Sequence, residues 1–215
     1  MTKEVELILQ TSTNYPNMIT LYHKISPKNQ AAIRSDLQDN CSGFLRTDMG
    51  KVARGRKRFW LKYVWNFRYK KLFQGVSHPR LEEYLSAIDI EYDLGVVSYA
   101  DKGTTWHRDG TFCDYTAYTI NLSIKPVEFG YQACYPKCGY SEQNLEAPKE
   151  MRLLMPGEII KYNAKNPHIT VNNDPNRWSI TLWKLKPSLR DSVTSFSLTG
   201  DEFDEVRDES AGVLF

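Results

Sequence analysis

The feature of this sequence that most constrains its fold is a series of short, strand-like segments after Tyr92. They are rich in β-branched and aromatic residues and are bounded by Gly, Pro, Asn or Asp. The segments are GVVSYA, AYTINLSI, MRLLM, GEIIKYN, HITV and RWSITLWKL. Such segments at close spacing are typical of a β-sandwich or a barrel, so we expect the sheet-rich core of the protein to lie here.

Two helices are predicted ahead of this core by the residues that would begin them. Ser26 followed by Pro27 is typical of a helix N-cap and of the first helical residue. Ser77-His78-Pro79 gives the same signal before RLEEYLSAI, in which apolar residues recur at helical spacing. Because helices are followed by a run of strands, the sequence indicates an α+β fold.

The composition is that of a globular protein, with 41% hydrophobic and 25% charged residues. No apolar run approaches the roughly 20 residues that a membrane helix needs, and MTKEVELILQ lacks the basic-then-apolar order of a signal peptide. We therefore expect a cytoplasmic protein with no membrane partner. A single domain is predicted over 1–215, with a helix-rich part at 1–92, the core at 93–187 and a tail at 188–215.

The four cysteines are too few, for a chain of this length, to form a disulfide scaffold. Cys134 and Cys138 lie four residues apart. Zinc sites prefer two such pairs, or one pair with a closely spaced histidine pair, and the sequence has neither pattern. We therefore expect free thiols.

The charge is unevenly distributed, although the net charge is only +2. Between Lys51 and Lys71 there are nine Lys or Arg and no acid, with aromatic residues interleaved, whereas Asp201–Glu209 holds six acids and one Arg. The basic stretch 51–71 suits a phosphate backbone with stacked bases. It equally suits a surface whose aromatic residues pack inward, and both interpretations stay open.

Two histidines and one aspartate form a candidate metal site. His107 and Asp109 make an H-x-D motif just after a predicted strand, and residues two apart on an extended backbone point the same way. His168 begins a later strand-like segment. Two His and one carboxylate are the ligands of the facial triad in non-haem Fe(II) oxygenases, which leaves positions open for a co-substrate and oxygen.

The spacing of further residues resembles that of the 2-oxoglutarate-dependent Fe(II) dioxygenases. Arg177 follows His168 by nine residues and Ser179 follows two later, giving H-x8-R-x-S, and 58 residues separate Asp109 from His168. The lead-in YADKGTTWHRD and the closing segment GEIIKYNAKNPHITVNNDPNRWSITLW are also similar to the family. The resemblance covers about residues 94–186 and implies a double-stranded β-helix core, jelly-roll or cupin-like, behind N-terminal helices.

This resemblance implies a role for each matching residue. His107, Asp109 and His168 would ligate Fe(II). Arg177 would pair with the far carboxylate of 2-oxoglutarate, for which its guanidinium fork is chemically suited. Ser179 would donate a hydrogen bond to the same carboxylate.

Three more residues are weaker carry-overs from the family. Tyr99 and Asn121 are candidates for further contacts to 2-oxoglutarate, and Trp106 could form a wall of the pocket. The implied enzyme uses O2 and 2-oxoglutarate to hydroxylate an unactivated C–H bond and releases succinate and CO2. Because halogenating relatives carry a small residue in place of Asp109, hydroxylation is favoured over halogenation.

The substrate is less constrained than the reaction. We favour a small molecule, such as an amino acid or natural-product intermediate, because R-x-S is frequent among enzymes of that kind. Nucleic-acid dealkylation by an AlkB-like enzyme is less favoured, since those enzymes usually carry a second Arg six residues after the first, where Trp183 stands. Prolyl-type peptidyl hydroxylases commonly place Lys at the position of Arg177. A non-catalytic binding module on the same fold is the remaining alternative.

Overall fold

The computed structural model describes residues 19–47, 55–66, 71–100, 103–109, 112–132, 149–171, 176–190 and 193–197. Three predictions fall outside these residues: those for Cys134 and Cys138, for the acidic segment Asp201–Glu209, and for both ends of the basic stretch. Cys41 and Cys113, which are described, are buried thiols outside any disulfide. Within the described chain, no helix is both long and apolar enough to span a membrane.

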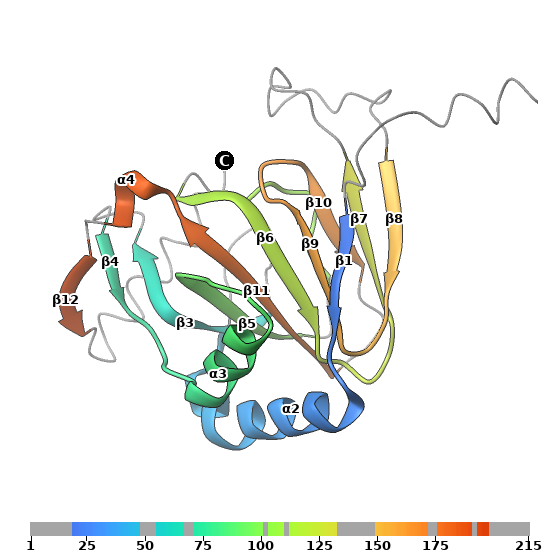
Figure 1. Cartoon of the computed structure of the whole chain (residues 1–215), viewed down its shortest axis with the longest axis horizontal. Helices are drawn as coiled ribbons and strands as arrows, with labels where there is room; N and C mark the ends of the chain where they lie inside the picture. Colours follow the sequence, from blue (N-terminus) through green and yellow to red (C-terminus); the bar gives the residue numbers. More distant parts are fainter. Residues whose placement is uncertain are drawn as a thin grey trace, which may run out of the picture.

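Two sheets form the framework of the molecule (Figure 1). The larger runs in the order β1-β9-β6-β11-β5-β3-β4-β12, with β2 paired to β3, and the smaller in the order β10-β7-β8. The strand pairs are antiparallel except for β4 with β12. The strand bounds are β1 Ile19–Lys24, β2 Arg46–Thr47, β3 Lys57–Asn66, β4 Lys71–Gln74, β5 Leu94–Ala100, β6 Cys113–Asn121, β7 Val127–Gln132, β8 Lys149–Leu154, β9 Glu158–Asn163, β10 His168–Val171, β11 Arg177–Leu185 and β12 Val193–Ser197.

All six predicted segments are strands: they form β5, β6, β8, β9, β10 and β11. The α+β class is also confirmed, because two helices precede these strands. The N-terminal part nevertheless holds strands as well as helices. All four of these strands belong to the large sheet, in which β1 pairs with β9 and β3 pairs with β5.

The two predicted helices are α2 (Pro27–Cys41) and α3 (Pro79–Ala87). A short 3-10 helix (Ser42–Phe44) follows α2 directly, and a further short helix, α4 (Pro187–Arg190), follows β11. The Ser26 hydroxyl accepts from the backbone N–H of Asn29, as expected for an N-cap. For α3 the cap is His78 and not Ser77, since His78 Nδ1 accepts from the N–H of Leu81 at 3.1 Å.

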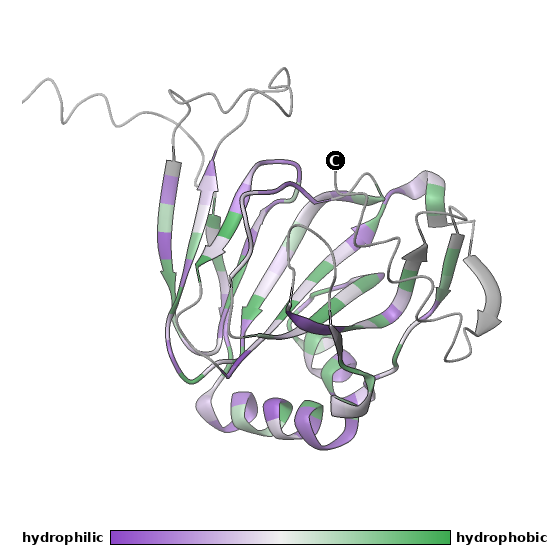
Figure 2. Cartoon of the chain, turned by 180° about the vertical axis from the view of Figure 1, so that it is seen from behind, coloured by the Kyte–Doolittle hydropathy of each residue, from purple (hydrophilic) through white to green (hydrophobic). Residues whose placement is uncertain are grey.

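Both helices pack against the outer face of the large sheet (Figure 1). Leu37 of α2 and Leu81 of α3 are fully buried there, in one cluster with the sheet residues Ile180 and Leu182. Removing each such leucine side chain from water contributes about 1.5–3 kcal/mol. The hydrophobic and hydrophilic bands that alternate along the strands (Figure 2) show the strand period that makes this two-faced packing possible.

On β11 this alternation decides where the site lies. Trp178, Ile180 and Leu182 face the helices, so the intervening residues, Arg177 and Ser179 among them, face the interior between the two sheets. The two faces are those expected from the sequence, and the structure shows that the polar one is the inner face.

Candidate metal centre

The two histidines are held together by their own backbones. His107 and His168 form an antiparallel bridge, in which each backbone N–H donates to the other residue's carbonyl, at 3.0 and 2.8 Å. Their ring centroids lie 4.3 Å apart. A residue of the loop after β5 and the first residue of β10 are thereby brought side by side, although 60 residues separate them along the chain.

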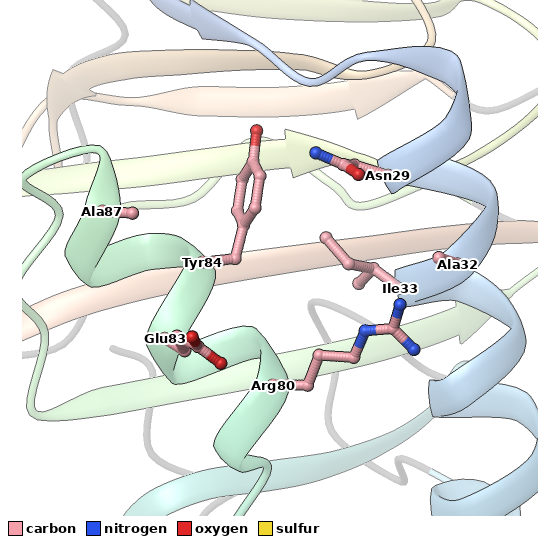
Figure 3. Close-up of a pocket in the computed structure, with 7 residues that line it drawn as sticks. All are labelled: Asn29, Ala32, Ile33, Arg80, Glu83, Tyr84 and Ala87. Atoms are coloured by element: carbon pink, nitrogen blue, oxygen red, sulfur yellow. The ribbon is translucent and has the colours of Figure 1, made fainter.

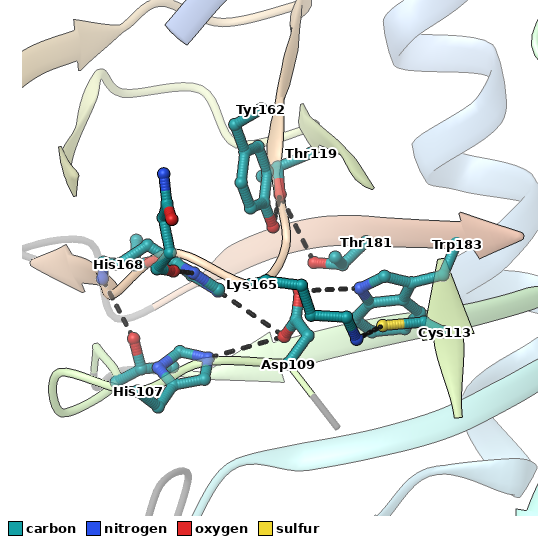
Figure 4. Close-up of polar contacts among 12 residues, drawn as sticks. His107, Asp109, Cys113, Thr119, Tyr162, Lys165, His168, Thr181 and Trp183 are labelled. Atoms are coloured by element: carbon teal, nitrogen blue, oxygen red, sulfur yellow. Dashed lines mark hydrogen bonds and ion pairs between the residues drawn. The ribbon is translucent and has the colours of Figure 1, made fainter. Parts of the chain in front are cut away.

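Asp109 completes the cluster (Figure 4). Its backbone N–H donates to the carbonyl of Ala164, and its Oδ1 lies 3.9 Å from Nε2 of His107 and 3.5 Å from Nε2 of His168. One donor atom from each of these three residues lies within 4.8 Å of the other two. A single small cation can therefore contact all three side chains from one side.

The donor atoms are oriented by hydrogen bonds behind them. His107 Nδ1 lies 2.8 Å from the carbonyl of Thr105, and His168 Nδ1 lies 2.9 Å from the carbonyl of Asn166. A carbonyl oxygen only accepts, so each Nδ1 carries the proton and each Nε2 is the atom turned toward Asp109. This is the tautomer that a metal ligand requires.

Trp183 orients the Asp109 carboxylate in the same way, through a hydrogen bond. Its indole N–H donates to Oδ2 of Asp109 at 2.7 Å, which leaves Oδ1 to face the two imidazoles (Figure 4). From the sequence alone, Trp183 is notable only because it stands where AlkB-like enzymes usually carry a second arginine. Because it lies on β11 six residues after Arg177, strand alternation places it on the same inner face.

The electrostatics of the three groups are strongly coupled. Burial and the charge of His168 lower the pKa of His107 to about 4. Burial opposes ionisation of Asp109, but the two histidines and the Trp183 hydrogen bond outweigh it and hold the pKa of that carboxyl below its usual value. Burial likewise disfavours the charged form of His168, whereas Asp109 favours it more strongly, so the pKa of His168 is raised.

Aromatic rings enclose the buried histidine. The Phe129 ring stacks on the His168 ring at 15° with centroids 6.0 Å apart, and the Tyr162 ring meets it edge-on at 5.0 Å. Burial and the nearby Asp109 raise the pKa of the Tyr162 phenol well above its usual value, so it stays neutral. These rings exclude water from one side of the cluster and fix the His168 imidazole plane.

Cys113 lies close to the cluster without adding a thiolate to it. Lys165 Nζ donates to its Sγ at 3.1 Å (Figure 4). Burial and the charge of Asp109 raise the pKa of this thiol to about 11, against the opposing effect of Lys165. A neutral thiol is a poor metal ligand, so the His and Asp side chains are the donors that the site offers.

Arg177 and Ser179 lie on the inner face of β11, where the sequence analysis expected a carboxylate-binding pair. Arg177 is only 2% exposed and pairs in register with Ala100 of β5, while Ser179 pairs with Ser98 of β5 on one side and Asn121 of β6 on the other. Ser98 therefore faces the interior beside Ser179, and it was not identified from the sequence.

Tyr99 lies apart from the other predicted site residues. This residue follows Ser98 on β5, so its side chain lies on the opposite, helix-facing side, where its ring packs 5.1 Å from Trp178. Its hydroxyl donates to Oδ1 of Asn176. The structure does not bring Tyr99 to the other predicted site residues, because adjacent strand residues point to opposite faces.

Asn121 and Trp106, predicted as a co-substrate contact and a pocket wall, differ in their burial. The Asn121 side chain is fully buried, and its amide donates to the carbonyls of Leu154 and Lys125 while its Oδ1 accepts from the N–H of Ser123. These bonds shape the turn that follows β6. Trp106, expected as a pocket wall, is 37% exposed.

A cavity of about 260 Å³ lies elsewhere, between α2 and α3 on the outside of the large sheet (Figure 3). None of the predicted site residues lines it. Its lining residues are Asn29, Ala32, Ile33, Arg80, Glu83, Tyr84 and Ala87.

Known proteins match this chain in fold but not in sequence. No protein-family model and no curated protein matches the sequence. Solved structures do match, among them a prolyl-4-hydroxylase from Pseudomonas putida, with 12% identity, 79% of this chain and 92% of that chain covered, and a TM-score of 0.53.

Two further matches are non-haem α-ketoglutarate-dependent enzymes from nogalamycin biosynthesis. The epimerase SnoN is 10% identical, with 93% of this chain and 98% of that chain covered and a TM-score of 0.56. The carbocyclase SnoK is 12% identical, with 94% and 95% covered and a TM-score of 0.53. SnoN also matches as its complex with Fe3+, α-ketoglutarate and nogalamycin RO. At these identities the likeness establishes the fold, and the chain has the double-stranded β-helix fold of the 2-oxoglutarate- and iron-dependent oxygenases.

Proposed function

We propose that this protein is an Fe(II)- and 2-oxoglutarate-dependent dioxygenase that hydroxylates an unactivated C–H bond of a small molecule. The observation that carries the proposal is the convergence of one donor atom each from His107, Asp109 and His168 within 4.8 Å. These residues have the identity, the tautomers and the second set of hydrogen bonds that a facial-triad iron site needs.

The residues present fit Fe(II) and its co-substrate. Two imidazoles and one carboxylate on one side of the cation leave its other side for 2-oxoglutarate and O2. When bound, Fe(II) with its co-substrate would supply the oxidising chemistry: 2-oxoglutarate is converted to succinate and CO2 while one oxygen atom of O2 enters the substrate. Because Asp109 keeps a carboxylate at the third position, hydroxylation is favoured over halogenation.

Arg177 and Ser179 are proposed to hold the far carboxylate of 2-oxoglutarate. The Arg177 guanidinium can donate two parallel hydrogen bonds to a carboxylate, and its burial lessens the solvent screening of that attraction. Ser179 lies two residues along the same strand face and can add a third hydrogen bond. Asn121 is assigned to the turn behind this pair and not to the co-substrate.

A small-molecule substrate is supported by three observations. The described part of the basic stretch places aromatic residues and Arg56 in the interior instead of forming an exposed basic surface. Trp183, bonded to Asp109, occupies the position where AlkB-like enzymes usually carry a second arginine. SnoN and SnoK are named as enzymes of nogalamycin biosynthesis, which makes natural-product chemistry a reasonable first class to screen.

Anaerobic calorimetry with 2-oxoglutarate tests the co-substrate assignment, with Mn(II) in place of the oxygen-sensitive iron. We expect 2-oxoglutarate to bind only when the metal is present. Arg177→Gln should weaken this binding about 10- to 100-fold, the usual cost of losing a charged hydrogen-bonding partner. Tyr99→Phe, on the outer face, is the matched control and should bind like the wild type. Binding that ignores the metal, or that Tyr99→Phe weakens as much as Arg177→Gln, would reject the assignment.

A further inference from the structure

Two arginines lie at the start of strand β3, Arg56 just before it and Arg58 within it, and the proposed function does not use them. Phe59 and Leu61 of this strand pack on the helix side of the sheet, whereas Trp60 packs in the interior. Arg56 and Arg58 precede Trp60 by four and two residues, so strand alternation directs them to the interior as well. Arg56 is accordingly 8% exposed and Arg58 is half-buried.

The sheet register places these arginines beside the proposed co-substrate pair. Arg58 pairs with Ser98 of β5, and Ser98 pairs in turn with Ser179 of β11. The three residues therefore form one row across adjacent strands on the inner face. Neighbouring strands lie about 4.8 Å apart, so the backbones of Arg58 and Ser179 are separated by roughly 10 Å.

Arg58 is also linked to the metal cluster through two tryptophan rings. The Arg58 guanidinium carbon lies 5.9 Å from the centroid of the Trp60 ring, and that ring lies 6.3 Å from the ring of Trp183, whose N–H donates to Asp109. Arg58 therefore lies beside the aromatic pair that supports the Asp109 carboxylate.

We propose that Arg56 and Arg58 bind an anionic group of the substrate, so that the substrate is an organic acid or a phosphate ester. This inference rests on the proposed function, in which Arg177 takes the far carboxylate of 2-oxoglutarate. Guanidinium groups bind carboxylates and phosphates with two parallel hydrogen bonds, and the flat face of Trp60 adds apolar contact area beside them.

The burial of Arg56 favours a compact anion over a polymer. A side chain that is 8% exposed inside the sheet framework is poorly placed to follow a phosphate backbone along the surface. Lys57 lies between the two arginines in sequence but is exposed, so it separates the two possibilities: a compact anion does not need it, whereas a surface polyanion does.

The test uses the protein loaded with Mn(II) and 2-oxoglutarate and measures probe binding by anaerobic calorimetry. The probes are phenylacetate, phenyl phosphate and the neutral phenylacetamide, and a single-stranded oligonucleotide is a fourth. We expect at least one of the two small anions to bind about 10-fold or more tightly than phenylacetamide. Arg58→Gln and Arg56→Gln should each remove most of that preference and change the affinity for 2-oxoglutarate less than about threefold, while Lys57→Gln keeps both.

The outcomes separate this inference from the proposed function. If 2-oxoglutarate does not bind to the metal-loaded wild type, the proposed function fails and this inference fails with it. If 2-oxoglutarate binds but the anions show no preference, or Lys57→Gln matches the arginine variants, only this inference is overturned. Loss of 2-oxoglutarate affinity in Arg58→Gln would assign that arginine to the co-substrate instead. Tight oligonucleotide binding that Lys57→Gln weakens would favour a nucleic-acid substrate.

Discussion

At the scale of single residues, the cluster is defined as much by the groups behind the three ligands as by the ligands. Backbone carbonyls hold the Nδ1 protons of His107 and His168, and an indole N–H holds one oxygen of Asp109. Such supporting hydrogen bonds orient a ligand and keep its donor atom available to the metal. The indole is the one support of this kind that a side-chain substitution removes cleanly.

Trp183→Phe should weaken divalent metal binding about 10-fold, within the 10- to 100-fold range typical of lost supporting hydrogen bonds. Phenylalanine keeps most of the packing against Phe112 and Trp60 but leaves the carboxylate free to rotate. Titration with Co(II), followed in the visible spectrum, measures the effect. Trp178→Phe, on the helix-facing side, is the control. Equal loss in both variants would mean that packing, and not the hydrogen bond, accounts for it.

The coupled titration of the two histidines predicts a pH dependence for metal binding. In the metal-free protein the raised pKa of His168, above 6.5, makes it the group that holds a proton, while the pKa of His107 is lowered to about 4. A metal must displace that proton, since only neutral imidazole binds. Co(II) affinity should therefore fall about 10-fold per pH unit once the pH drops below the pKa of His168. Affinity that is constant between about pH 6 and 8 would contradict this.

The three cluster residues could be grouped from the sequence because it shows two features. In H-x-D, residues two apart on an extended backbone point the same way, and the spacing to His168 can be counted directly. The sequence did not show on which face of β5 Tyr99 lies, because the exact residue at which β5 starts sets the parity of the whole strand. A shift of one residue exchanges Tyr99 for Ser98. The partners of Asn121 are backbone groups of the turn after β6 and of Leu154 on β8, which no sequence pattern reveals.

At the scale of elements, the sequence Ser77-His78-Pro79 predicts the start of helix α3 but does not show which residue caps it. Pro79 begins the helix as expected, but the capping acceptor is the His78 imidazole. Its other nitrogen, Nε2, lies 3.0 Å from Oδ2 of Asp36 on α2. One buried side chain thus caps α3 and ties it to α2.

His78→Ala should lower the free energy of unfolding by about 1–3 kcal/mol, because it removes both the cap and the polar contact with Asp36. Ser77→Ala should change it by no more than about 0.5 kcal/mol, since Ser77 is exposed and caps nothing in the structure. Urea unfolding followed by circular dichroism measures both. A larger loss in Ser77→Ala than in His78→Ala would restore the cap to Ser77.

The strands that the sequence analysis did not identify have physical reasons for being missed. β3 carries Lys and Arg on both faces, so it lacks the usual apolar–polar alternation. Its inner face lies beside the candidate site and its outer end is exposed to water. β7 contains Gly130, which reads as a break in a strand. In the structure, a Cβ at Gly130 would lie 2.6 Å from Ile169 and 2.7 Å from Met151, so the glycine admits the side chains of both neighbouring strands.

At the scale of the whole molecule, the N-terminal part and the core share one sheet. β1 is the edge strand beside β9, and β3 lies beside β5, so residues on both sides of Tyr92 exchange backbone hydrogen bonds. The predicted single domain over 1–215 therefore has a direct consequence for unfolding.

We expect one cooperative unfolding transition, since breaking the β3–β5 pairing would expose the core between β5 and the helices. Urea transitions followed by tryptophan fluorescence and by far-ultraviolet circular dichroism should coincide within error. Two separated transitions would show that the N-terminal part unfolds on its own and that the chain has more than one domain.

The most direct test of the central claim is an anaerobic titration of the purified protein with Fe(II) and then 2-oxoglutarate, followed in the visible spectrum. We expect a charge-transfer band that requires both components, is lost in His107→Ala and is weakened in Arg177→Ala. Admission of oxygen should then bleach the band and yield succinate. A wild-type protein that leaves the iron in solution and shows no band would contradict the assignment of His107, Asp109 and His168 as an iron site.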